Sequence, residues 1–242
     1  MRRSLFAFLL SMVTVLGSMS WAFSAQDDAT ERLQKAGDVL KEILNTPDKG
    51  IPEEVLDSAK CIVVVPHLIK GGFIVGGKHG RGVASCRTAN GWSAPAFVSV
   101  GGGSWGLQIG AEGVDLVMLV MNEKGLQHLL SSKFQISGEG SAAAGPVGRH
   151  ASAGTDWKLN TELLTYSRSK GAFAGLTLEG AVIEQDTDST VAIYGKDVPF
   201  RESLMGEVKP PAAAAPFMAA LQMASHKATA RESKEDMKES KK

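Results

Sequence analysis

The sequence has few cysteines and no excess charge of either sign. Its 242 residues include two cysteines, and 26 Lys and Arg balance 26 Asp and Glu. A net charge of zero argues against a general nucleic-acid-binding protein, which is normally clearly basic. Two cysteines without a nearby pair of histidines are too few ligands for a metal site, so we expect neither metal nor cofactor. The hydrophobic content of 43% excludes a wholly disordered chain.

Long apolar runs are missing except at the N-terminus. Arg2 and Arg3 precede an apolar stretch over 5–16, and Ala22-Phe23-Ser24 follows as a small-x-small site. This layout predicts a secretory signal peptide over residues 1–24, with cleavage after Ser24 favoured over Ala25. The alternative is an uncleaved anchor, although the run is short of the ~20 residues that span a bilayer. We therefore expect an exported protein, periplasmic or secreted, that is soluble or peripheral to a membrane.

Export would place the two cysteines in an oxidising compartment, where they can form a disulfide. Cys61 opens an apolar run and Cys86 closes a second one. If the two strands lie antiparallel, the cysteines face each other and form a disulfide in an oxidising compartment. Such a bridge stabilises the fold by about 3 kcal/mol in the chain-entropy model. The alternative is a pair of buried free thiols.

Hydrophobic periodicity predicts an α+β fold. Helical spacing over 29–45 predicts an N-terminal helix, and Pro52 favours a short helix over 53–59. Short apolar pieces separated by glycines between residues 61 and 121 predict a mainly antiparallel β sandwich or barrel-like sheet. One further short helix is expected at 124–132. Further strands are expected at 134–136, 159–166, 172–178 and 182–184.

Composition also predicts the domain limits. Residues 25–200 form a single domain, and residues 209–216 are a Pro/Ala linker. A short helix is possible at 217–224. The charged residues that follow predict a solvated tail, so 201–242 is taken as linker and disordered tail.

Two glycine motifs point to catalysis or nucleotide binding, but both lack the required context. Residues 102–106 satisfy G-x-S-x-G around Ser104, and Asp115 and His128 follow in hydrolase order. A nucleophile elbow needs a strand, a sharp turn and a helix, whereas the residues after Ser104 alternate as a strand does. The overlapping G-x-G-x-x-G at 101–106 fails the same test. We therefore expect a protein that is not an enzyme, with no catalytic residue.

An acidic cluster offers a possible cation site. Glu184, Asp186 and Asp188 lie close together, but the sixth position counted from Asp186 is Val191 rather than the glycine that an EF-hand requires. A polar turn is the preferred interpretation.

Basic residues beside glycines form the remaining candidate site. Glycine-rich turns can present backbone N–H groups to a phosphate, and Lys or Arg then match its charge. The alternative is scattered, solvated charge on hairpin turns. The candidate lipid-binding residues are Lys70, Lys78, Arg81, Arg149, Lys158, Arg168 and Lys170.

Several segments resemble the SYLF domain, also called the Ysc84-type domain, of lipid-binding and actin-associated proteins. The resemblance covers about residues 29–200. It is specific because the segments occur in the same order and spacing. They are KGGFIVGG at 70–77 with GRG at 80–82, GWSAPAF at 91–97, GGGSWGLQIG at 101–110, LLSSKF at 129–134, AGPVGR at 144–149, SRSKGAFAGL at 167–176 and YGKD at 194–197.

The resemblance implies a non-enzymatic module that binds anionic phospholipid head groups, with phosphatidylinositol-type lipids preferred by eukaryotic members. Some eukaryotic relatives bind actin filaments. The export signal and the lack of SH3 or FYVE modules make this chain similar to a bacterial periplasmic member. The competing hypothesis is a structural or protein-interaction domain of the envelope without a lipid ligand; the protein partner is unknown.

Overall fold

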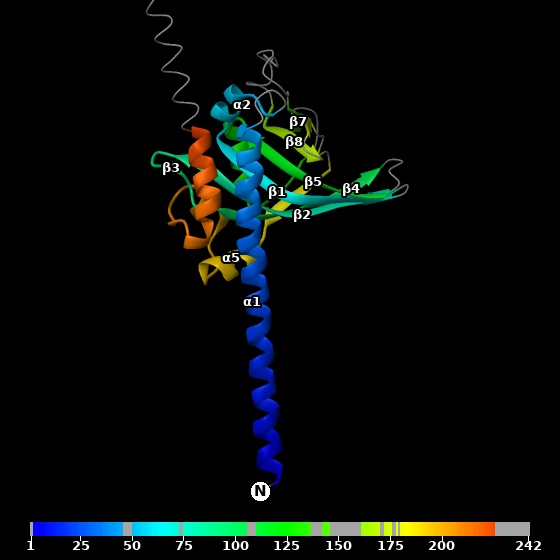
Figure 1. Cartoon of the computed structure of the whole chain (residues 1–242), viewed down its shortest axis with the longest axis vertical. Coiled ribbons are helices and arrows are strands. Elements are labelled where there is room, and N and C mark those ends of the chain that lie inside the picture. Colours follow the sequence, from blue (N-terminus) through cyan, green and yellow to red (C-terminus); the bar gives the residue numbers. More distant parts are fainter. Residues whose placement is uncertain are drawn as a thin grey trace, which may run out of the picture.

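The computed structural model describes residues 2–45, 50–72, 75–105, 110–136, 142–145, 161–169, 172–175, 178 and 180–225. Figure 1 shows one curled sheet with helices packed against it and a long N-terminal helix that extends beyond the sheet. The predicted α+β class with a mainly antiparallel, barrel-like sheet is confirmed, since all strand pairs except β7–β8 are antiparallel.

Helix α1, Arg2–Asn45, includes the helix predicted over 29–45. Its buried side includes Ala29, Leu33, Ala36 and Leu40, which are all at most 2% exposed and recur at helical spacing. No helix of the described chain combines the length and the hydropathy needed to span a bilayer. The signal peptide over residues 1–24 stays a prediction.

The sheet is built around four long strands, and its order is β6-β10-β4-β2-β1-β5-β8-β7, with β3 on β2 and β9 on β8. Its strands are β1 (Cys61–Gly72), β2 (Val75–Thr88), β3 (Gly91–Trp92), β4 (Ala96–Trp105), β5 (Gly110–Val120), β6 (Lys133–Gln135), β7 (Ala142–Ala144), β8 (Leu163–Ser169), β9 (Ala172–Gly175) and β10 (Val182–Gln185).

The prediction that glycines separate short strands is wrong for much of this region, because many of these glycines lie inside paired strands. Gly77 pairs with Gly103, and Gly82 pairs with Val98. A Cβ atom at Gly82 would lie 2.3 Å from the Val64 carbonyl oxygen, so the close approach of β1 requires a glycine there. The alternating residues after Ser104 predict a strand that includes 107–109, and these three residues lie outside the described part of the chain.

Both faces of the sheet are buried, because side chains alternate along each strand. Ile62, Val64 and Phe97 point to the face covered by α1. Val63, Val65 and Val98 point to the opposite face, with α3 (Glu123–Leu129) and α6 (Phe200–Leu204). Cys61 and Cys86 are opposite one another on β1 and β2 and form the disulfide.

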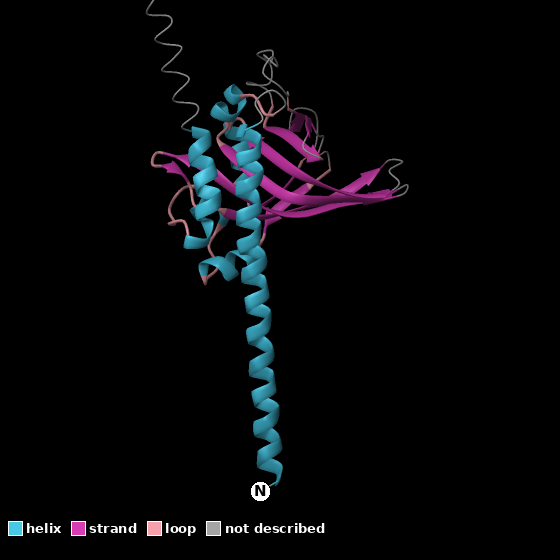
Figure 2. Cartoon of the chain, in the orientation of Figure 1, coloured by secondary structure: helices cyan, strands magenta, loops and turns pink. Residues whose placement is uncertain are grey.

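Short helices complete the fold (Figure 2), and α2 (Glu53–Ser58) lies where it was predicted. The predicted polar turn at Glu184, Asp186 and Asp188 is wrong, because Asp186 is the N-cap of α5 (Thr187–Tyr194) and accepts a hydrogen bond from the Ser189 N–H. The Asp186-x-x-Ser189 spacing is an N-cap signal that the search for metal ligands overlooked.

The packed core continues past residue 200. The chain forms a short 3-10 helix, η1 (Ala212–Ala214), and then a helix over 215–225 that lies beside α1 (Figure 1). Phe217 and Leu221 of this helix are fully buried in the same cluster as Leu33 and Leu40. A Cβ at Gly37 would lie 2.8 Å from the Pro216 carbonyl oxygen, so the two helices meet where α1 has no side chain.

Candidate functional site

Lys70 and Lys78 are brought together by the pairing of β1 with β2. They are cross-strand partners, and Glu112 is the partner of Lys70 on the other side, on β5. Directly opposite residues have Cβ atoms about 5 Å apart on one face of a sheet. Both lysines are half-buried. Lys78 of β2, Lys70 of β1 and Glu112 of β5 therefore place two positive charges and one negative charge on three neighbouring strands.

Burial lowers the pKa of Lys70, and the Glu112 carboxylate opposes this shift. Glu112 itself accepts a hydrogen bond from the Ser169 hydroxyl at 2.9 Å. Like charges opposite one another destabilise a sheet, and the Glu112 carboxylate beside Lys70 partly offsets this repulsion.

Arg81 lies on the opposite face of the sheet from this pair. Its Nε is 3.8 Å from the Asp186 carboxylate, and its side chain is half exposed. The same carboxylate oxygen binds the buried Arg32 guanidinium at 3.0 Å. Ser189 donates its hydroxyl to that oxygen at 2.7 Å. Arg81 therefore belongs to a charge cluster that fixes α5 to α1 and β2.

Arg168 connects the sheet to α1. Its guanidinium contacts Glu42 at 2.6 Å and Asp115 at 3.0 Å, and its side chain is 22% exposed. Asp115 also accepts a hydrogen bond from the His67 backbone N–H at 3.1 Å. These contacts make Arg168 part of the helix–sheet interface, on the same face as Arg81.

The candidate residues are thus divided. Lys70 and Lys78 lie together, whereas Arg81 and Arg168 lie on the other face and are engaged in ion pairs. The prediction of one continuous cationic site does not hold for these four residues. Arg149, Lys158 and Lys170 lie outside the described residues.

Ser104, Asp115 and His128, the residues of the hydrolase hypothesis, lie in different elements and have different partners. Ser104 is in β4 and pairs with Gly76 of β2, so the backbone continues as a strand through Trp105. Asp115 binds Arg168, and His128 Nδ1 is 2.8 Å from the buried Glu162 carboxylate. The described part of the motif therefore lacks the strand–turn–helix geometry of a nucleophile elbow.

Sequence reasoning missed two features that the fold assembles. The first is the Arg32–Asp186–Ser189 cluster, whose members are 154 and 157 residues apart in the chain. The second is a surface groove around Trp92. Asn90-Gly91 before Trp92 is a typical hairpin-turn signal, but no local pattern shows that residues 205–225 form the other wall.

Comparisons with known proteins show the family to which this domain is similar. A family model described as "Ysc84: Las17-binding protein actin regulator" matches residues 101–224. An SH3 domain-containing protein of Schizosaccharomyces pombe is 35% identical over 193 residues, covering 76% of this chain and 45% of that protein. The SH3 domain-containing YSC84-like protein 1 of Rattus norvegicus is 31% identical over 188 residues, covering 75% of this chain and 55% of that protein.

Protein YSC84 of Saccharomyces cerevisiae is 31% identical over 198 residues, covering 78% of this chain and 42% of that protein. The chain spans about half the length of the curated relatives it matches. These matches define a domain shared with Protein YSC84 and with relatives that are named SH3 domain-containing proteins. The chain belongs to the Ysc84 family, which confirms the SYLF-type resemblance.

Proposed function

We propose that this chain is a non-enzymatic module that binds anionic phospholipid head groups at a membrane surface, as an exported protein. The observation that supports this function is the cross-strand pair of Lys70 and Lys78. Neighbouring ammonium groups suit a phosphate group, which accepts hydrogen bonds from both. Phosphatidylinositol-type lipids are the candidates with the highest head-group charge.

The position of the pair also supports surface binding. The ends of β1, β2, β4 and β5 form an arm that extends beyond the helices (Figure 1). On its opposite face the arm carries Ile69, which is 48% exposed. Each Lys near an anionic surface contributes about 1 kcal/mol, so this pair gives weak, reversible binding.

Liposome flotation tests this proposal. The full chain is mixed with vesicles of phosphatidylcholine alone or with added phosphatidylserine or phosphatidylinositol phosphate, at two salt concentrations. We expect binding to the anionic vesicles only, and weaker binding at high salt. Equal binding to both vesicle types, or binding that salt does not change, contradicts the electrostatic proposal.

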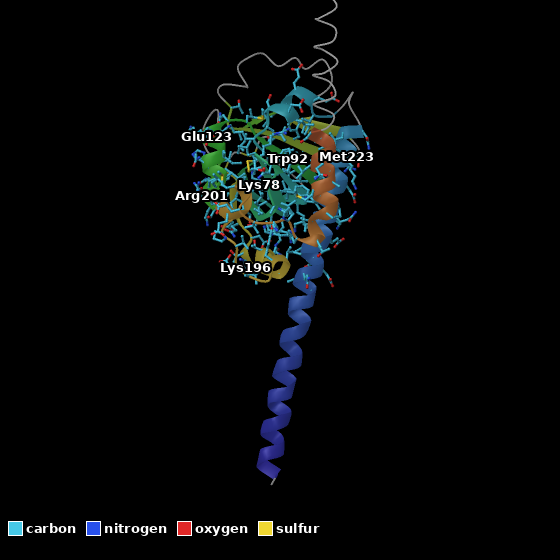
Figure 3. All side chains as sticks on the ribbon, turned by 90° about the vertical axis from the view of Figure 1, so that its left-hand side faces the viewer. Lys78, Trp92, Glu123, Lys196, Arg201 and Met223 are labelled. Atoms are coloured by element: carbon cyan, nitrogen blue, oxygen red, sulfur yellow. A yellow bond between two sulfur atoms is a disulfide. The ribbon has the colours of Figure 1, made fainter. Side chains whose placement is uncertain are left out.

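Matched variants assign the site. Lys70→Gln with Lys78→Gln removes about 2 kcal/mol of attraction, so we expect about 30-fold weaker binding. Lys196→Gln with Arg201→Gln removes two exposed charges from the helical body and serves as the control (Figure 3). If both double variants lose binding equally, the charge effect is not local to the arm.

A second candidate function is protein interaction without a lipid ligand. The family description names Las17 binding and actin regulation, so a protein partner is a reasonable expectation for this chain as well. A pull-down partner that survives detergent, together with no liposome binding, favours this second function over the first.

A further inference from the structure

A groove lies at the opposite end of β2 from the lysine pair. Its walls are the β2–β3 hairpin, the segment 205–210 and the helix over 215–225, and its volume is about 760 Å³. This volume is within the range of small-molecule and peptide sites. The residues that matter below are Asn90, Trp92, Met205, Lys209, Met218 and Gln222.

Trp92 is held in place by neighbours on two elements, β2 and the helix over 215–225. The Arg87 guanidinium lies 4.6 Å from the centroid of its ring, and its Nε1 donates a hydrogen bond to the Ser225 hydroxyl at 2.8 Å. Arg87 is itself fixed, because it donates to the carbonyl oxygens of Ala59 at 3.0 Å and Leu56 at 3.3 Å. A large aromatic side chain that is already ordered loses little conformational freedom when a ligand binds.

The rest of the lining combines apolar and hydrogen-bonding side chains. Met205 is 47% exposed, and Met218 lies on the helix wall. Methionine adapts its shape to different partners, and tryptophan and methionine are enriched where proteins bind one another. Asn90 and Gln222 add amide donors and acceptors. An acyl chain would leave these amides without partners, whereas a peptide backbone matches them.

The charged residue among the described lining residues is positive, Lys209, and the Arg87 guanidinium stacks on the Trp92 ring. Two acidic residues lie close by without lining the groove: Glu207 is exposed in the 205–210 wall, and Asp57 interacts electrostatically with Arg87. The charge of the lining itself therefore complements an acidic ligand and repels a basic one.

We propose that this groove binds an extended acidic peptide segment of a partner protein, with an apolar side chain packed against Trp92 and the methionines. This proposal is separate from lipid binding, because Lys78 and Thr88 are ten positions apart on β2, which corresponds to about 33 Å. Figure 3 looks along the arm, so Lys78 and Trp92 lie near each other in projection, although Lys78 is near the start of β2 and Trp92 of β3 pairs with Arg87 near the end of β2.

The experiment is selection of peptides from a random dodecapeptide phage library on the purified full chain, followed by fluorescence anisotropy with labelled synthetic peptides. We expect the selected sequences to be enriched in Asp and Glu around one apolar residue. Enrichment in Lys and Arg, or no enrichment, overturns the proposal.

Variants then locate the site. We expect Lys209→Glu and Met205→Asp each to weaken binding of a selected peptide at least tenfold, and Lys196→Glu to leave it unchanged. Trp92→Phe keeps an aromatic ring but removes the hydrogen bond to Ser225, and we expect a loss of threefold to tenfold. Unchanged thermal unfolding of Met205→Asp shows that its loss of binding is not a loss of fold. Equal binding by wild type and all three groove variants overturns the proposal.

Two further measurements test whether something other than a partner peptide occupies the groove. If a chain ending at Ser225 binds the peptide more than tenfold more tightly than the full chain, the segment 226–242 is the occupant and the proposal is overturned. If anionic vesicles displace the peptide and Met205→Asp loses vesicle binding, the groove is a lipid site and the proposal also fails. Retained peptide binding in Lys70→Gln with Lys78→Gln supports two separate sites.

Discussion

The two ends of β2 differ in what supports them. At one end, Gly77 and Lys78 belong to the glycine-rich start of β2. The strands here form an arm that extends beyond the helices (Figure 1). At the other end, Cys86 and Arg87 lie in a body where the sheet is covered by helices on both faces. The body therefore holds the buried core that stabilises the fold.

The charged residues follow the same division. In the body, Arg32 and Arg168 each contact a carboxylate within hydrogen-bond distance. In the arm, Lys70 lies between a like charge, Lys78, and an opposite charge, Glu112, and burial still lowers its pKa. Four predictions test this contrast, from the largest expected effect to the smallest.

The largest loss of folding stability is expected on substitution of Arg32. Arg32→Met leaves the buried Asp186 carboxylate with Ser189 and the more distant Arg81. Removing one partner of a buried ion pair costs about 3–5 kcal/mol, and we expect the lower end of this range because those partners remain. Denaturant unfolding of the full chain measures the loss.

Lys35→Met is the control for Arg32. Lys35 lies on the exposed side of the same helix, and its ion pair with Glu31 is solvent-exposed. We expect a change of less than about 0.5 kcal/mol. Equal losses for the two variants would mean that the buried cluster does not hold α1 on the sheet.

The second prediction concerns the disulfide. Cys61→Ala with Cys86→Ala opens a loop of 25 residues, and the loss is about 3 kcal/mol in the chain-entropy model. Reductant should lower the melting temperature of the wild type but not that of the variant. A melting temperature that reductant leaves unchanged in the wild type contradicts the presence of the bridge in the folded protein.

The third prediction compares glycines of the body and the arm. Gly82→Ala places a Cβ 2.3 Å from the Val64 carbonyl oxygen, so β1 and β2 must move apart. We expect a loss of about 2 kcal/mol, as for other overpacked cores. Gly103, which pairs with Gly77 in the arm, has nothing within 4 Å of an added Cβ, so Gly103→Ala should change stability by less than about 0.5 kcal/mol. Similar losses for both would remove the distinction between the two regions.

The sequence predicted features that depend on local patterns. Helix α1 was predictable over 29–45 because Leu33, Leu40 and their neighbours repeat at helical spacing. The disulfide was predictable because each cysteine lies at the end of an apolar run, and the strands were expected to be antiparallel. Lys70 and Lys78 were candidates because they are basic residues beside glycines, but the sequence did not show that they are cross-strand partners.

Features that depend on tertiary contacts were not predictable. Nothing near Arg81 or Arg168 in the sequence shows that Asp186 and Glu42 bind them. The glycines were taken as turns because glycine is common in turns, but at Gly82 it is required by the approach of a neighbouring strand. The Trp92 groove requires segments that are more than 100 residues apart in the chain.

The smallest effect is expected at Lys70, where stability and binding should change in opposite directions. Burial lowers the pKa of Lys70 from its ordinary value of 10.5, so its charge is less favourable in the folded than in the unfolded protein. Lys70→Met should therefore raise the free energy of unfolding at neutral pH by less than about 1 kcal/mol while weakening binding to anionic vesicles. The penalty in the wild type is present below the folded pKa and disappears as pH rises toward 10.5, so the two unfolding curves should converge over that window. A Lys70→Met variant that is less stable than the wild type, or one that binds vesicles equally well, contradicts the view that the arm holds an unfavourable charge for an anionic ligand.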